Sequence, residues 1–196
     1  NVKIDRRKKV LATVFLKAVD FFTSNSEIMD DFFEKKELDL TTYYGKYKDT
    51  ELEEILKTKI EGSFVAEDIL DEETGEFLAE SEELVDNIFI EKLIENKIEK
   101  ITIWEVKPED RIIANALIHD TTKTNDEAVI EVFRKLRPGD LVTVESARSL
   151  VKQMFFNPQR YDLADVGRYK INVRLKLNIP EDEIVLTKED VLQTIN

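Results

Sequence analysis

Basic side chains are concentrated in one part of this chain. The window of residues 148–176 holds seven basic residues against two acidic ones, in a protein whose formal net charge is −13. Positive charge that is segregated on an acidic background indicates an anionic partner, and a phosphate backbone is a common one. This window and the residues just before it include Arg137, Arg148, Lys152, Arg160, Arg168, Lys170 and Arg174.

Two explanations of these arginines compete. A DNA backbone is a dense line of negative charge, and contacts from Lys and Arg release the counterions condensed on it. Arg also presents a planar fork that fits guanine edges or phosphate. The plainer alternative is local ion pairing, in which the partners are Asp140 for Arg137, Asp162 for Arg160 and Asp165 for Arg168.

A second basic group, Arg6, Arg7, Lys8 and Lys9, lies near the N-terminus. Apolar residues recur at helical spacing from Lys8 to Phe22, which predicts a helix that these basic residues enter. Positive charge is unfavourable at the start of a helix, so an external anion is one explanation. The other is a basic helix entry packed against acidic neighbours.

Residues with catalytic chemistry form no recognisable constellation. The chain has no cysteine, which excludes disulfides and cysteine-based zinc sites. The single histidine, His119, has no obvious triad partners, and the five glycines are not clustered into a phosphate-binding loop. We expect no catalytic residue, no metal ligand and no cofactor in this segment.

Charge divides the chain into three regions. Residues 1–17 carry a net charge of +5, residues 18–119 a net charge of −17, and residues 120–196 a net charge of −1.

No apolar run approaches the roughly 20 residues of a membrane span, and the N-terminus lacks the apolar core of a signal peptide. A soluble, intracellular protein is expected. The first residue is not Met and the chain ends within a helical pattern, which suggests a piece of a longer protein.

Hydrophobic periodicity predicts a mixed fold. Further helices are expected from residue 25 or 26, over 82–96, from Asn125 or Asp126 to Leu136, from Thr143 to Phe156 and over 163–177. Thr187 with Asp190 resembles the capping box of a final helix. The middle of the chain predicts a β-hairpin, 63–70 with 76–80 around the turn 71–75, and a strand around Trp104. The pair Phe155-Phe156 is expected to pack in the core, and Trp104 is expected to be either a core or a surface residue of the middle segment.

The amino-acid sequence of the basic stretch contains specific motifs. It reads RPGD at 137–140, FFNPQRYDL at 155–163 and VGRYKIN at 166–172, while the start reads IDRRKKVLATVFLKAV at 4–19. These motifs, in this order, resemble the lobe domain of the bacterial RNA polymerase β subunit. That family carries RPG, a phenylalanine pair before Arg-Tyr-Asp-Leu, a Gly-Arg-x-Lys-x-Asn run and an IDRRRKLPAT helix entry.

The resemblance implies an α+β fold with a mainly helical, discontinuous lobe subdomain, residues 1–36 and 120–196. The acidic residues 37–119 would be an inserted small α+β module. The lobe forms a wall of the DNA cleft of an enzyme that makes RNA on a DNA template. The implied site is a pocket for a flipped guanine of the non-template strand, formed with the help of Arg137 and Arg160. Arg168, Lys170 and Arg174 are implied more generally, as lobe surface near DNA.

The same resemblance implies the partners. They are the non-template strand and downstream duplex, the α, β′, ω and sigma subunits, and transcription factors on the insertion; Mg²⁺ is held by another subunit, through a motif that this chain lacks. A cytoplasmic, nucleoid-associated location follows. One departure concerns Leu141-Val142, where the family usually has Pro-Pro. The alternatives are a non-catalytic interaction module with an acidic docking surface, and a free-standing nucleic-acid-binding protein, which the overall charge disfavours.

Overall fold

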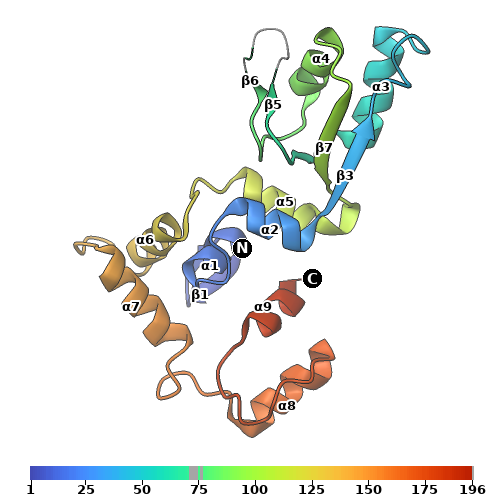
Figure 1. Ribbon diagram of the computed structural model, residues 1–196. Coiled ribbons are helices and arrows are strands. Elements are labelled where there is room, and N and C mark those ends of the chain that lie inside the picture. Colours follow the sequence, from blue (N-terminus) through green and yellow to red (C-terminus); the bar gives the residue numbers. More distant parts are fainter. Residues whose placement is uncertain (71–74, 76, 196) are drawn as a thin grey trace. The chain divides into compact units, whose positions relative to one another are not determined.

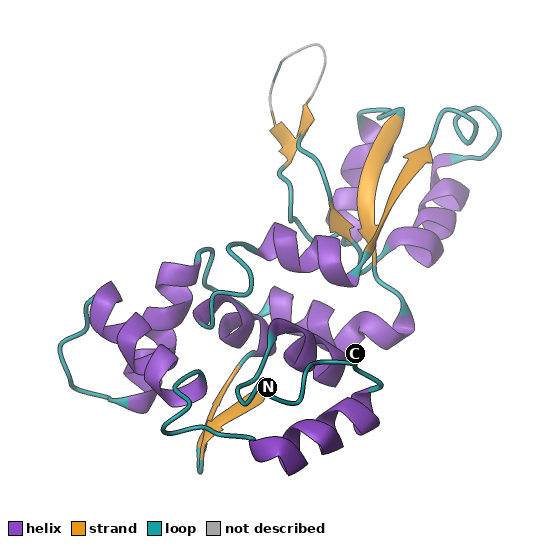
Figure 2. Cartoon of the chain, turned by 60° about the horizontal axis from the view of Figure 1, so that its bottom comes forward, coloured by secondary structure: helices purple, strands orange, loops and turns teal. Residues whose placement is uncertain are grey.

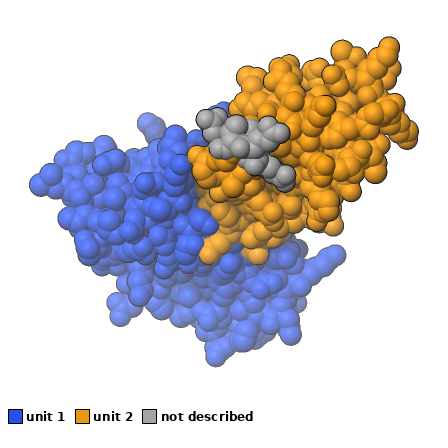
Figure 3. All heavy atoms as spheres, turned by 45° about the horizontal axis from the view of Figure 1, so that its top comes forward, with its two compact units in different colours: residues 1–24, 119–196 blue, residues 25–118 orange. Residues whose placement is uncertain are grey.

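The computed structural model describes residues 1–70, 75 and 77–195, and it divides into two compact units. Unit 1 comprises residues 1–24 and 119–196, and unit 2 comprises residues 25–118 (Figure 3). Unit 1 is therefore made of two separate stretches of the chain, while the lobe over 1–36 and 120–196 with an insertion over 37–119 stays a prediction. The segment 25–36 belongs to unit 2 because its strand pairs there and because Asp30 accepts a hydrogen bond from Trp104.

Unit 1 combines a two-stranded hairpin with helices (Figure 1). Its elements are β1 (Val2–Asp5), β2 (Lys8–Val10), α1 (Ala12–Ala18), α6 (Asn125–Leu136), α7 (Val144–Phe155), α8 (Ala164–Leu175) and α9 (Lys188–Ile195). The prediction of a helix from Lys8 was wrong at its start, because residues 8–10 pair with β1 and the helix begins at Ala12. Ile4 and Val10 turn into the core from the two strands, which a helical count could not distinguish.

The core of unit 1 forms where α1 packs against α6 and α7. All seven residues of α1 are buried, and the apolar face of α6 supplies Ala128, Val129, Val132 and Phe133. Phe155 and Phe156 meet Phe15 and Phe21 edge to face, with ring centroids 5.3 and 5.8 Å apart. The predicted packing role of the phenylalanine pair is confirmed.

A buried ion pair ties the returning chain to α1. Lys17 Nζ lies 3.1 Å from Asp120 Oδ2, and both side chains are fully buried. Asp120 also accepts hydrogen bonds from the hydroxyls of Thr13 and Thr122, and Lys17 donates to the carbonyl of Thr122. Burying two charges is costly unless they are paired and hydrogen-bonded, and both conditions hold here.

Unit 2 is built around a three-stranded antiparallel sheet of order β3-β7-β4 and a separate strand pair (Figure 2). The strands are β3 (Glu34–Asp39), β4 (Phe64–Val65), β5 (Ile69–Leu70), β6 (Phe77–Ala79) and β7 (Lys100–Glu105). The helices are α2 (Asn25–Phe32), α3 (Asp49–Ile60), α4 (Asn87–Glu95), η1 (Pro108–Asp110) and α5 (Arg111–Ile118). The α+β fold class is confirmed, since helices predominate over small sheets.

The core of unit 2 is separate from that of unit 1. Leu52, Leu56 and Ile60 of α3 pack with Phe89, Ile90 and Leu93 of α4 and with the sheet. Trp104 is buried in this unit, so it is a core residue, where the sequence had left core and surface both open. Of the predicted hairpin, only β5 and β6 pair with each other, whereas residues 64–65 of its first strand pair with β7 instead; residues 71–74 and 76 lie outside the described residues.

Candidate nucleic-acid interface

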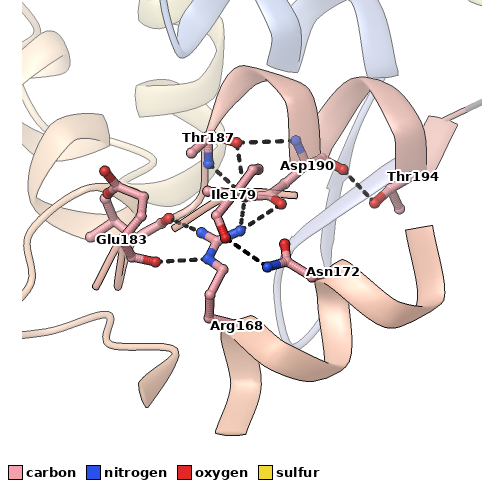
Figure 4. Close-up of polar contacts among 8 residues, drawn as sticks. Arg168, Asn172, Ile179, Glu183, Thr187, Asp190 and Thr194 are labelled. Carbon is pink, nitrogen blue, oxygen red and sulfur yellow. Dashed lines mark hydrogen bonds and ion pairs between the residues drawn. The ribbon is translucent and has the colours of Figure 1, made fainter. Parts of the chain in front are cut away.

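Arg168 of α8 is fully buried (0% exposed). Its Nη1 donates to both carboxylate oxygens of Asp190 at 2.7 and 2.8 Å, its Nε to the carbonyl of Glu183 at 2.7 Å, and its Nη2 to the carbonyl of Val185 at 2.5 Å (Figure 4). The prediction that Arg168 is a surface residue near DNA was wrong. Its carboxylate partner is also not Asp165, the acid nearest in sequence, but Asp190.

Asp190 has a second function at the start of α9. Its Oδ2 accepts the backbone N–H of Thr187 at 2.8 Å, and the Thr187 hydroxyl accepts the backbone N–H of Asp190 at 3.2 Å. The predicted capping box is therefore confirmed. Because one carboxylate serves both the cap and Arg168, the pair fastens α8 to the segment 183–190. The sequence analysis identified Asp190 only as a capping residue of the final helix, and its role as the partner of Arg168 was missed.

Lys170 and Arg174 are exposed on the same helix. At 100° per residue they are turned by roughly 200° and 240° from Arg168, so they share the opposite face of α8. Among the described residues neither is in an ion pair. Tyr169, Val166 and Val173 are exposed beside them. These two cations are available to an external partner, as the sequence analysis expected of surface residues.

Arg137 ends α6 and begins the loop to α7. Its backbone N–H bonds the carbonyl of Phe133 at 2.7 Å, while its side chain is exposed and makes no ion pair within the described part of the chain. Two residues on, Gly139 adopts φ +96°, a conformation that side chains rarely permit. Leu141, where the family usually has proline, is 98% exposed. The predicted alternative, a pair with Asp140, is not formed.

Arg160 lies in the turn that follows α7. The turn is closed by the backbone N–H groups of Arg160 and Tyr161, which donate to the carbonyl of Asn157 at 2.9 and 2.8 Å. The Arg160 side chain is exposed, and no carboxylate in the described ranges is within ion-pairing distance of it. Its predicted alternative partner, Asp162, instead accepts the backbone N–H of Ala164 at 2.7 Å.

Arg137 and Arg160 lie beyond opposite ends of α7. That helix has 12 residues, a length of about 18 Å at 1.5 Å per residue. The whole of α7 therefore lies between the two residues in the chain, and the single pocket that the resemblance implied stays a prediction.

Arg148, in the middle of α7, is an arginine whose charge is neutralised by carboxylates of the same chain. Its Nη2 lies 2.6 Å from Asp126 Oδ1 and its Nη1 lies 3.5 Å from Asp20 Oδ1. The hydrogen bond to Asp126 raises the pKa of the Arg148 guanidinium. Ion pairing within the chain thus explains Arg148 and Arg168, and it leaves Arg137 and Arg160 without an internal partner among the described residues.

No described helix is both long and apolar enough to cross a membrane. In the same residues, no group of three or more histidine or acidic side chains is arranged to hold a metal ion.

Known proteins resemble this chain along its whole length. The family model "RNA polymerase Rpb2, domain 2" matches residues 108–196. The DNA-directed RNA polymerase subunit beta of Fusobacterium nucleatum subsp. nucleatum is 65% identical over 197 residues, covering 100% of this chain and 17% of that protein. The subunits of the same name from Protochlamydia amoebophila and Bacteroides thetaiotaomicron are 34% and 32% identical, covering 95% and 98% of this chain and 14% and 16% of those proteins. The chain thus spans less than a fifth of these relatives.

Proposed function

The chain belongs to the family of bacterial RNA polymerase β subunits, and from that membership we propose that it forms part of the DNA-binding cleft of a transcribing enzyme. The parent enzyme joins ribonucleoside triphosphates into RNA on a DNA template, with Mg²⁺ held by another subunit. This segment contributes no catalytic group. It positions DNA, through Arg137 and Arg160 toward the non-template strand and through Lys170 and Arg174 toward the backbone.

One observation carries this proposal. In a protein with a net charge of −13, Arg137 and Arg160 are exposed and have no carboxylate partner among the described residues. An unpaired arginine on an acidic molecule is a site for an external anion, and its planar fork matches phosphate oxygens or a guanine edge. Because α7 separates the two side chains, each contacts the DNA at its own point.

The remaining partners follow from the proposed assembly. They are the α, β′, ω and sigma subunits, together with the downstream duplex, and the complex lies in the cytoplasm with the nucleoid.

The acidic unit 2 does not face DNA, since like charges repel. Residues 18–119 carry a net charge of −17, which favours a second role, as a docking surface for a basic protein factor. Loss of a factor's binding on replacing unit 2 with a short linker would establish that role.

The test of the main proposal uses the assembled polymerase and promoter DNA. Arg137→Ala and Arg160→Ala are made singly and together, and the dissociation constant of the promoter complex is measured for each. Loss of one arginine contact costs about 1–3 kcal/mol, or roughly tenfold to a hundredfold in affinity. Because the contacts are separate, the two free-energy losses add to within about 0.5 kcal/mol in the double variant.

Arg148→Ala is the matched control, because its charge is neutralised by Asp126 and Asp20. It leaves promoter affinity unchanged. Equal affinity for all variants rules out the DNA contact. If the double variant binds the promoter no more weakly than either single variant, the two arginines form one shared pocket and do not make two separate contacts.

A further inference from the structure

Arg6 and Arg7 form the turn of the β1–β2 hairpin. Asp5 and Lys8 pair across it, and both arginine side chains are exposed. Asp5 Oδ1 accepts the backbone N–H of Arg6 at 2.7 Å rather than pairing with a guanidinium group. Neither arginine is in an ion pair among the described residues, so two unpaired cations stand side by side at the tip.

The hairpin carries more positive charge behind its tip. Lys3 and Lys9 are directly opposite one another in the strand register, and both are exposed. Like charges at opposed positions of an antiparallel pair destabilise it. A bound anion offsets this repulsion, so contact with a polyanion would stabilise the hairpin.

Side-chain contacts place this hairpin beside the end of α6. Lys8 Nζ donates to the carbonyl of Leu136 at 2.9 Å, and Lys135 Nζ donates to the carbonyl of Lys9 at 3.3 Å. Leu136 is the residue before Arg137. Two regions more than a hundred residues apart in sequence therefore meet at one of the proposed DNA contacts.

The acidic residues around this junction do not neutralise it. Glu131 lies 3.8 Å from Lys135, and Asp140 makes no ion pair with a described residue. The basic residues of the last turn of α6, Arg134 and Lys135, are favourable for the helix dipole and need no external partner. That explanation does not apply to Arg6 and Arg7, which lie in the hairpin turn.

We propose that Arg6 and Arg7 bind DNA phosphates next to the nucleotide that Arg137 contacts, so that the hairpin tip and the end of α6 form one continuous strand-binding surface. The inference rests on the proposed function and extends it to residues at the other end of the chain. The contact is to the sugar–phosphate backbone, so it does not depend on base sequence.

The experiment measures promoter affinity of the assembled polymerase as a function of salt concentration. Arg6→Gln and Arg7→Gln are combined in one variant, which keeps polar side chains of similar reach in the turn and leaves Lys8 in place. Arg137→Ala is measured in parallel, and Arg148→Ala is the control with a neutralised arginine. Circular dichroism of the isolated chain checks that the hairpin variant folds.

The slope of log affinity against log salt is negative, and each lost phosphate contact makes it less negative by about 0.7 on single strands and about 0.9 on duplex. The hairpin variant is therefore expected to reduce the magnitude of the slope by about 1.4 to 1.8 on every promoter sequence, while Arg148→Ala leaves it unchanged. An unchanged slope for the folded hairpin variant overturns the inference. If Arg137→Ala still weakens binding in that case, the proposed function stands without it. If the hairpin variant alone changes the slope, Arg6 and Arg7 bind phosphate, but the assignment of Arg137 fails and the continuous surface with the end of α6 is overturned.

Discussion

The guanidinium group of Arg168 makes four hydrogen bonds inside the chain, whereas that of Arg137 makes none with the described residues. Both residues belong to sequence motifs of the same basic stretch. Their surroundings separate them, because an arginine that is fully buried and bonded to a carboxylate and two carbonyls is out of reach of phosphate. Arg168 is therefore a structural residue.

Replacing Arg168 by alanine is expected to destabilise unit 1 strongly. Breaking a buried ion pair by removing one partner costs about 3–5 kcal/mol, since the other charge stays buried without it. Chemical denaturation of the chain, followed by circular dichroism, measures the loss. Lys170→Ala on the exposed face of the same helix is the control and changes stability by less than about 0.5 kcal/mol. Similar stabilities for the two variants would contradict the assigned role of Arg168.

The sequence revealed which arginines were candidates but not which were available. Its pairing alternatives were limited to acids within three residues, such as Asp165 for Arg168. The actual partner, Asp190, lies 22 residues away and is brought close by the fold of the segment between α8 and α9. Long-range ion pairs of this kind have no local signature.

At the scale of elements, the helices were largely predictable because their caps are local. Thr143 accepts the N–H of Ser146 and begins α7 as expected, and Thr187 with Asp190 begins α9. The cap of α6 is Thr124 rather than Asn125 or Asp126. Strand β3 was missed, since its sequence EKKELD has no apolar face and only its pairing with β7 makes it a strand.

The contact between α2 and β7 makes a prediction about acid stability. Asp30 accepts a hydrogen bond from Trp104 Nε1 at 2.8 Å, and its carboxylate lies 2.9 Å from Lys35 Nζ. The hydrogen bond from Lys35 is the largest of the causes that lower the pKa of Asp30 below its ordinary value of 3.8. A depressed folded-state pKa stabilises the fold above the unfolded value, and this contribution is lost as the pH falls through the folded value.

Asp30→Asn tests that linkage while keeping an acceptor for the indole. The parent chain is expected to exceed the variant in stability above about pH 4, and the difference should vanish at lower pH. Fluorescence of Trp104, the only tryptophan of the chain, follows unfolding of unit 2. A stability difference that does not change with pH would show that the charge of Asp30 contributes nothing.

At the scale of the whole chain, the division of charge anticipated a division of the fold. The acidic middle and the two ends fold as separate compact units with separate cores. The exact boundary was not predicted, because the membership of α2 and β3 in unit 2 depends on their contacts with β7. The domain assignment in terms of lobe and insertion stays a prediction.

Residues 25–118 are expected to fold when expressed alone. They form a continuous stretch of chain with its own core, and a domain of roughly this size can be independently stable. Cooperative thermal unfolding, followed by Trp104 fluorescence, would confirm it. A non-cooperative transition with a solvent-exposed tryptophan would show that unit 2 depends on the rest of the chain.

Photocrosslinking in the promoter complex tests most directly whether the unpaired arginines face DNA. A photoreactive amino acid replaces Arg137 in one polymerase, Arg160 in a second and Arg148 in a third, and the crosslinked nucleotides are mapped. The account predicts crosslinks to the non-template strand from positions 137 and 160, at two different nucleotides because α7 separates them, and none from position 148. Crosslinks from 137 and 160 to protein alone would contradict it.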